Sequence, residues 1–268
     1  MQKIISKFFI LLFVLYSSCE NKTIRDKEGL IVYQENQISW VRNFEPLNPV
    51  SIPRWPTRGG IYESLYLNNP ITTDWVPWLA TNYKWENNNK KLLFTIRPNV
   101  QWSDGKPFSA HDVAYTLNLW NQYPALDTRN AWEYLKSVVA VSDTLVQIDF
   151  KRIYVPGFEA IAGAPIIPKH IWKELEDPLD FSNPDPVGTG PFTEILRFNS
   201  QVWELGKNHN YWQPGKPHIE KLVFPTFSSN EQTTLALLSG NLDWAGAFIP
   251  AIQRIYVDKN PEHHHYWF

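Results

Sequence analysis

Acidic side chains are the most abundant groups in this sequence that could do chemistry, and there are 27 of them. A glycoside hydrolase needs two carboxylates at a fixed separation across the bond that it breaks. No local motif selects such a pair, and the sequence contains neither a G-x-S-x-G nucleophile motif nor a phosphate-binding G-x-x-x-x-G-K. We therefore expect no catalytic residues, and a hydrolase is the weakest interpretation.

Three consecutive histidines, His263, His264 and His265, are the residues that most suggest a metal. Imidazole nitrogens are good ligands for nickel and zinc. Consecutive residues do not easily all face one ion, because the chain would have to fold back on itself. We therefore expect a solvated tail here, with no bound metal and no cofactor.

The one cysteine, Cys19, directly follows a segment that has the features of an export signal. Two lysines give residues 1–18 a positive start, and the apolar run that follows them is too short to span a bilayer permanently. Residues 16–19 resemble the processing site of a bacterial lipoprotein. This resemblance implies a signal peptide over 1–18, a lipid on Cys19, and a polar membrane tether over 19–28.

The composition indicates a folded domain without a nucleic-acid partner. The chain has 268 residues, of which 43% are apolar and 15% aromatic, enough for one large core or two moderate ones. Its net charge of -2 leaves no basic field for a phosphate backbone. Prolines outnumber glycines by 21 to 12, which favours ordered loops.

Apolar periodicity and turn residues predict a mixture of strands and helices. In the clearest helix, Ser109 can cap the start with Asp112 as its partner, and Pro124 ends it. A turn is expected at 103–107. The other expected elements are strands at 29–35, 91–96, 219–227 and 242–245, hairpins at 137–150 and 193–205, and helices at 168–176 and 229–240. This mixture indicates an α/β or α+β domain.

Four segments carry a family resemblance when they are taken together and in order. They are 94–120 (a strand, an Asp-Gly turn and an A-x-D-V helix), 186–192 (P-V-G-T-G-P-F), 206–212 (ending N-x-x-Y-W) and 234–244 (a helix, then G-N-L-D). The chain resembles the family 5 extracellular solute-binding proteins, which are the oligopeptide- and dipeptide-binding components of bacterial ABC importers.

The resemblance implies an α/β fold with a lobe like those of type II periplasmic binding proteins. The first lobe would comprise 29–48 and 165–268, and an inserted α+β subdomain would occupy 49–164. Members of the family are about twice as long, so the resemblance also implies that the second lobe is missing. A fragment, a truncated reading frame or a split gene would each produce such a chain.

The residues that define these motifs are interpreted as structural. Asp-Gly sequences favour tight turns, and glycine permits a close approach of two backbones. The residues assigned to this role are Asp104, Gly105, Asp112, Gly188, Gly190 and Pro191.

A separate group of residues lies where the resemblance places the ligand cleft. Aromatic faces stack on sugar rings and on peptide side chains, and a carboxylate can fix a peptide amino group. An equally good interpretation of the carboxylates is a hydrogen bond at the hinge between the lobes. The candidate ligand-binding residues are Trp40, Glu45, Asn48, Trp55, Asp243, Trp244 and Phe248.

We thus expect a lipid-anchored binding protein, on the outer face of a membrane, that delivers an oligopeptide to the permease subunits of an ABC importer. The alternative ligand is a β-linked oligosaccharide, because residues 77–80, 165–172 and 240–244 look especially similar to the branch of the family that binds such sugars. Some relatives of the family bind nickel, which is a further and weaker alternative.

Overall fold

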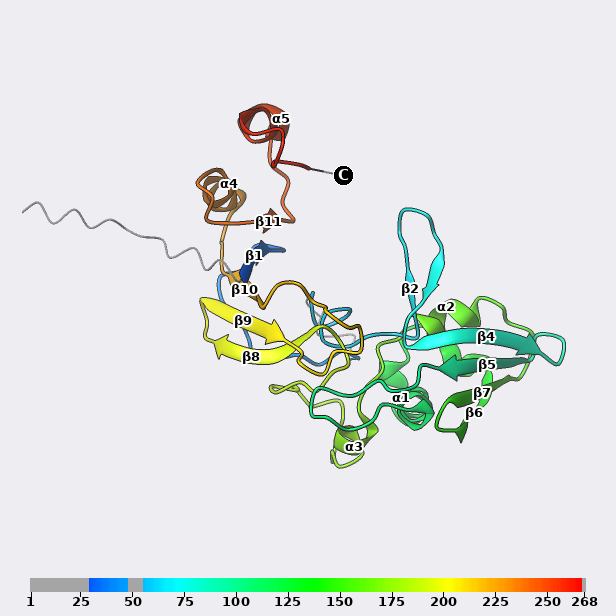
Figure 1. The fold of residues 1–268 in the computed structure, drawn as a ribbon. Helices are drawn as coiled ribbons and strands as arrows, with labels where there is room; N and C mark the ends of the chain where they lie inside the picture. The colour runs from blue at the N-terminus through cyan, green and yellow to red at the C-terminus, as the bar shows by residue number, and fades with distance from the viewer. Residues whose placement is uncertain (1–28, 48–54, 267–268) are drawn as a thin grey trace, which may run out of the picture.

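The computed structural model describes residues 29–47 and 55–266. These residues form two larger sheets that lie side by side, and a two-stranded hairpin (Figure 1). The predicted signal peptide, the lipidation site at Cys19, the tether and Asn48 lie outside the described residues. The described part is a mixed α/β fold, as the sequence predicts.

The first sheet has five strands in the order β11-β1-β10-β9-β8. Strand β1 lies between β10 and β11 and pairs with both in parallel, whereas β9 pairs antiparallel with β10 and with β8. The strand bounds are Gly29–Tyr33 for β1, Phe192–Phe198 for β8, Val202–Lys207 for β9, Lys221–Pro225 for β10 and Trp244–Ala245 for β11.

The second sheet has four antiparallel strands in the order β4-β5-β7-β6. A separate hairpin of β2 and β3 stands beside it. The strand bounds are Tyr66–Asn68 for β2, Trp75–Pro77 for β3, Ala80–Glu86 for β4, Lys91–Ile96 for β5, Leu135–Ser142 for β6 and Leu145–Phe150 for β7.

Short helices cover the two sheets. The α-helices are α1 (Ala110–Gln122), α2 (Gly157–Ala162), α3 (Lys169–Trp172), α4 (Asn230–Leu238) and α5 (Ile252–Ile255). The 3-10 helices are η1 (Pro124–Leu126), η2 (Ala131–Glu133) and η3 (Val257–Lys259). None of the helices in the described part is long and apolar enough to cross a membrane.

Helix α1 forms for the local reasons that the sequence suggests. The hydroxyl of Ser109 accepts a hydrogen bond from the backbone of the first turn, and the carboxylate of Asp112 accepts one from the backbone amide of Ser109, so the predicted capping box is confirmed. Val113, Leu117 and Trp120 are buried on one face of the helix, which packs against β6 and β7.

Other elements are shorter than predicted. The helix expected at 168–176 is a single turn, and Pro168 caps it with extended backbone angles instead of starting it. The strand expected at 219–227 spans 221–225. In α4, the buried positions are Thr233, Ala236 and Leu237, while other leucines of the helix face outward.

The apolar core is continuous across both sheets, and a smaller core lies under α4 and β11. All strands of the five-stranded sheet fall in the predicted first-lobe ranges, and all strands of the four-stranded sheet fall within 49–164. The boundary itself stays a prediction, because the two sheets share one large core.

The contact between 60–61 and 188–192, here called the seam, joins the two halves through their backbones. The amide of Gly190 donates to the carbonyl of Ile61 at 2.9 Å, and that of Phe192 donates to the carbonyl of Gly60 at 3.1 Å. A Cβ at Gly188 would lie 2.0 Å from the carbonyl oxygen of Ile61, and one at Gly190 would lie 2.1 Å from that of Gly60. The close approach predicted from glycine is therefore present.

We predict that Gly188→Ala destabilises the protein by about 3 kcal/mol or more, because backbone on both sides of the seam has to move. The control is Gly215→Ala, whose added Cβ meets nothing within 4 Å and whose cost comes only from its positive φ of 76°. That cost should be about 1 kcal/mol. Urea unfolding of both variants measures the difference, and equal losses would contradict the role given to the seam.

Candidate functional site

The structure brings two of the predicted ligand-binding aromatics together. The rings of Trp55 and Trp244 have centroids 6.3 Å apart and are tilted by 40°, and Trp55 also packs edge-on against Phe224. Trp55 remains 42% exposed, and Phe248, four residues after Trp244, is 76% exposed. Trp55, Trp244 and Phe248, here called the aromatic surface, thus keep apolar area available to a ligand.

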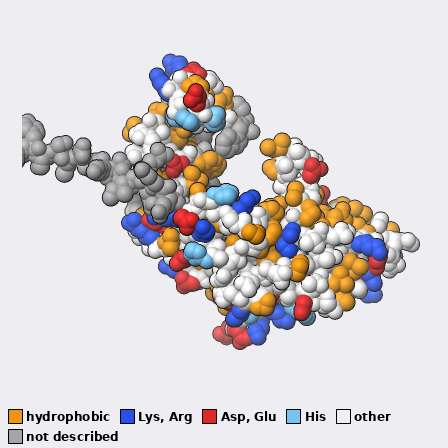
Figure 2. All heavy atoms as spheres, in the orientation of Figure 1, with side chains coloured by type: hydrophobic (Ala, Val, Ile, Leu, Met, Phe, Trp, Pro, Cys, Tyr) orange, Lys and Arg blue, Asp and Glu red, His pale blue; other side chains and the backbone are white. Residues whose placement is uncertain are grey.

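A cavity of about 490 Å³ opens beside the aromatic surface. Trp244 and Phe248 line it together with Asp243 and with residues of α5 and the C-terminal segment. The residues that line this cavity all lie between Leu237 and Tyr266. Figure 2 shows this C-terminal part standing apart from the β2–β3 hairpin, which carries hydrophobic side chains. This volume lies in the range of small-molecule sites, which are mostly apolar with few polar groups.

Asp243 connects the cavity to the sheet. One of its carboxylate oxygens accepts a hydrogen bond from the backbone amide of Ile31 at 2.9 Å, and its own amide donates to the carbonyl of Ile31 at 3.0 Å. These bonds align β11 with β1 and hold Trp244 at the start of the cavity wall. Capture of a ligand amine by Asp243 stays a prediction.

The other predicted residues lie inside the protein. Trp40 is 8% exposed and packs edge-on against Trp203. Glu45 is 2% exposed, and its carboxylate accepts from the backbone amide of Leu47 at 2.7 Å. These internal contacts are enough to explain why Trp40 and Glu45 are buried. A role of either residue in ligand binding stays a prediction.

Glu63 is a buried carboxylate that the sequence analysis did not single out. It is 1% exposed, and it accepts hydrogen bonds from the indole of Trp78 at 2.6 Å, the indole of Trp212 at 3.0 Å and the hydroxyl of Tyr211 at 3.0 Å. Burial raises the pKa of Glu63 to about 7, although these hydrogen bonds favour its charged form. No local motif surrounds Glu63. Its hydrogen bonds to Tyr211 and Trp212, which are far away in the sequence, are the signal that would have identified it.

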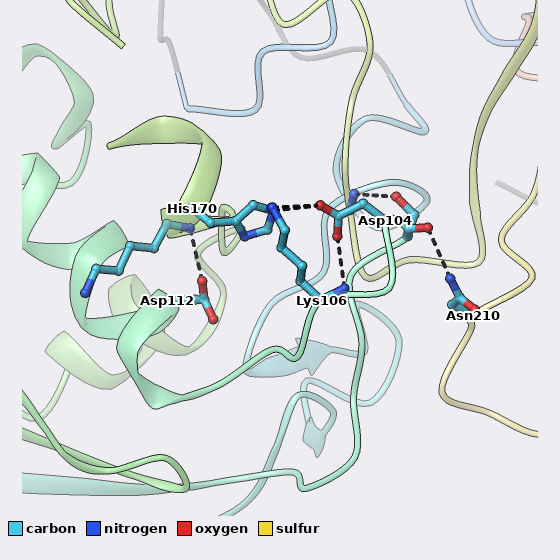
Figure 3. Close-up of polar contacts among 8 residues, drawn as sticks. Asp104, Lys106, Asp112, His170 and Asn210 are labelled. Carbon is cyan, nitrogen blue, oxygen red and sulfur yellow. Dashed lines mark hydrogen bonds and ion pairs between the residues drawn. The ribbon is translucent and has the colours of Figure 1, made fainter. Parts of the chain in front are cut away.

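The motif residues of the Asp-Gly turn form a polar cluster of their own (Figure 3). The carboxylate of Asp104 lies 2.8 Å from Nε2 of His170, and it also accepts from the backbone amide of Lys106 at 3.2 Å. Asp112 accepts from the backbone amide of Lys169 at 3.0 Å, which ties α1 to α3. Gly105 has a φ of 83°, as a glycine turn requires. The contacts of this cluster are internal to the protein.

The histidine segment does not gather into a metal site within the described residues, where no group of three or more potential ligands lies together. His264 instead stacks on Tyr256 with ring centroids 3.9 Å apart, and its Nδ1 lies 2.8 Å from the carbonyl oxygen of Tyr256. His263 and His265 line the cavity beside the aromatic surface.

Comparison with known proteins gives a family match. The model for bacterial extracellular solute-binding proteins, family 5, matches residues 74–267. The nickel-binding periplasmic protein of Escherichia coli is 28% identical over 244 residues, which cover 84% of this chain and 44% of that protein. The oligopeptide-binding protein OppA of Bacillus subtilis is 26% identical over 189 residues, covering 63% of this chain and 34% of that protein.

Solved structures agree with the sequence matches. A periplasmic oligopeptide-binding protein of an ABC transporter from Thermotoga maritima, solved with bound mannohexaose, superposes with a TM-score of 0.78. It is 28% identical, and the match covers 87% of this chain and 43% of that one. A dipeptide-binding protein from Pseudoalteromonas, solved with Met-Leu, has a TM-score of 0.70 at 21% identity and therefore shows the fold alone. This chain spans less than half the length of the first relatives that it matches.

The pKa of Glu63 predicts how stability depends on pH. The folded state holds the carboxyl proton of Glu63 up to about pH 7, whereas the unfolded chain releases it near pH 4.5. The contribution of Glu63 to the free energy of unfolding is therefore largest below pH 4.5, and it is lost as the pH rises through 7. The loss should be roughly 3 kcal/mol. We predict that Glu63→Gln, which cannot titrate, lacks this decline in unfolding free energy.

Urea unfolding from pH 4 to 8 tests this prediction. The quantity measured is the difference in unfolding free energy between the unchanged protein and Glu63→Gln at each pH. The matched control is Glu220→Gln, because the carboxylate of Glu220 lies at the surface beside Lys207. Parallel curves for the unchanged protein and Glu63→Gln would show that Glu63 is not the titrating group.

Proposed function

Because the chain belongs to the bacterial extracellular solute-binding proteins of family 5, we propose that it captures an oligopeptide for import by an ABC transporter. The observation that carries this proposal is the aromatic surface of Trp55, Trp244 and Phe248 beside a cavity of about 490 Å³. Its sequence relatives include oligopeptide-binding proteins and a nickel-binding periplasmic protein.

In this proposal the lobe described here supplies one wall of the site. A second lobe closes over the peptide, excludes water from it, and the closed form docks on the permease subunits. The peptide's side chains pack on the exposed rings, where each buried aromatic contact contributes through its large apolar area. The protein itself performs no chemistry, since its work is capture and release.

An oligosaccharide is the second candidate ligand, and one specific observation favours it. Trp55 and Trp244 form an open pair of indole rings, and such rings also suit the faces of sugars. The Thermotoga relative, solved with mannohexaose, supports this candidate as well. The same aromatic surface would serve either ligand, so the choice depends on the polar groups around it.

We further propose that the protein is a lipoprotein that works outside the cytoplasmic membrane. The relatives that it matches include periplasmic proteins. Lipidation of Cys19 would hold the domain at the membrane through the polar stretch that follows, and would keep it close to the permease.

We predict that Phe248→Ala weakens peptide binding by about tenfold, since it removes an exposed ring from the ligand face. Isothermal titration calorimetry of the full-length protein against tripeptides and mannohexaose measures this effect. Leu235→Ala is the matched control, because Leu235 is 69% exposed on α4 and does not line the cavity. The proposal fails if neither class of ligand binds, or if both variants bind as the unchanged protein does.

We predict that Cys19→Ala releases the protein from membranes into the soluble fraction, because the lipid attachment atom is removed. Fractionation of cells that express the unchanged and variant proteins measures this. Cys19→Ala protein that still sediments with the membrane would rule out lipidation at this residue.

A further inference from the structure

A second cavity, separate from the one beside the aromatic surface, opens where helix α1 ends. It has a volume of about 310 Å³, and its walls come from the last turn of α1 and from the segments of η1 and η2. It shares no lining residue with the cavity beside the aromatic surface, and α1 and α5 lie far apart in the molecule (Figure 1). Its volume is at the lower end of the range of small-molecule sites.

Two tryptophans that line this cavity differ from the other tryptophans of the protein. Within residues 29–47 and 55–266, every other tryptophan packs against another aromatic ring. Trp120 and Trp132 have no such neighbour in that part of the chain, yet both line the cavity. Trp120 is buried, whereas Trp132 is half-buried, and its indole nitrogen donates to the carbonyl oxygen of Leu117 at 2.6 Å. The cavity therefore has a preformed wall of two indoles.

Two exposed asparagines line the same cavity. Within the described part of the chain, the side-chain amides of Asn121 and Asn130 make no hydrogen bond. The backbone of Asn130 is nevertheless fixed, because its amide donates to the carbonyl oxygen of Asp127 at 2.9 Å. A side-chain amide has two N–H donors and a carbonyl acceptor, so each asparagine matches groups that both donate and accept, such as hydroxyls.

The two acids that line the cavity already have partners for their charge. Both oxygens of Asp127, which is 7% exposed, accept backbone amides at 2.8 Å, and the carboxylate of Glu133 lies 3.7 Å from Arg152. A carboxylate has about four acceptor positions, so Asp127 keeps positions for a further donor. Among the described residues, no lysine, arginine or histidine lines this cavity, which disfavours an anionic ligand. The groups present thus match a neutral molecule with hydroxyl groups.

We propose that this cavity is a second ligand site, which binds a neutral sugar ring. A sugar ring has an apolar face of C–H groups and a rim of hydroxyls, so it combines the two chemistries that the cavity offers. Its face packs on Trp120 and Trp132. Its hydroxyls form hydrogen bonds with Asn121, Asn130 and Asp127. This site is independent of the proposed function, because it lies away from the aromatic surface on which that function rests.

Isothermal titration calorimetry of the full-length protein with cellobiose, a neutral disaccharide, tests the second site. Asn130→Gly removes the side-chain amide, and glycine readily adopts the left-handed backbone of this position. We expect this change to weaken cellobiose binding by about fivefold, because hydrogen bonds from the cavity to the sugar are lost. Asn121→Ala should weaken it by a similar factor for the same reason. Both residues are exposed, so neither variant removes a core contact.

Asn88→Gly is the matched control for Asn130→Gly. Asn88 is also exposed, has the same φ of 51° and does not line the cavity. This variant should bind cellobiose as tightly as the unchanged protein does.

Three results would overturn the second site. The first is that the unchanged protein does not bind cellobiose. The second is equal binding by the unchanged protein, Asn121→Ala and Asn130→Gly; a loss in Phe248→Ala would then place the sugar on the aromatic surface. The third is binding of choline but not of cellobiose, which would show that the acids select a cation. Titration with tripeptides tests the proposed function separately, so the failure of one is distinguished from the failure of the other.

Discussion

The backbone contact at the seam is the constraint on which the rest of this structure depends. The loop that contains Gly188 and Gly190 lies so close to Gly60 and Ile61 that no side chain fits between the two backbones. The approach joins a segment that leads into the five-stranded sheet to one that leads into the four-stranded sheet. The continuous core that spans both sheets depends on this junction.

Glu63, directly after the seam, forms a second connection through its hydrogen bonds. Its three donors come from Trp78, Tyr211 and Trp212, so one carboxylate connects both halves of the chain. Arg97 lies 4.4 Å from the ring centre of Trp212 and also donates to the carbonyl oxygen of Trp78 at 2.7 Å. A buried carboxyl group with three hydrogen-bond donors fixes geometry more than it adds stability. We infer that it orients the two indoles.

Local patterns predicted much of the fold and little of the site. The capping box of α1, the β6–β7 hairpin and the strand Lys91–Ile96 follow from neighbouring residues, so the sequence was sufficient for them. The parallel pairing of β1 with β10 and β11 joins residues about two hundred positions apart, so no pattern of neighbouring residues predicts it.

The candidate site likewise divides into residues that the sequence predicted correctly and residues whose position depends on the tertiary fold. Trp55 and Trp244 were selected by type and position, and the fold brings them together. Trp40 was selected for the same reasons, but the fold buries it against Trp203, since an aromatic in an irregular segment can as easily fill a core.

The central claim is that ligand binds against the aromatic surface and not elsewhere on the two sheets. Hydrogen–deuterium exchange of the full-length protein, with and without saturating peptide, tests this most directly. The account predicts slower exchange at 243–249 and around Trp55, with unchanged exchange in the β6–β7 hairpin at 135–150. Protection confined to that hairpin, or absent from 243–249 while peptide is bound, would contradict it.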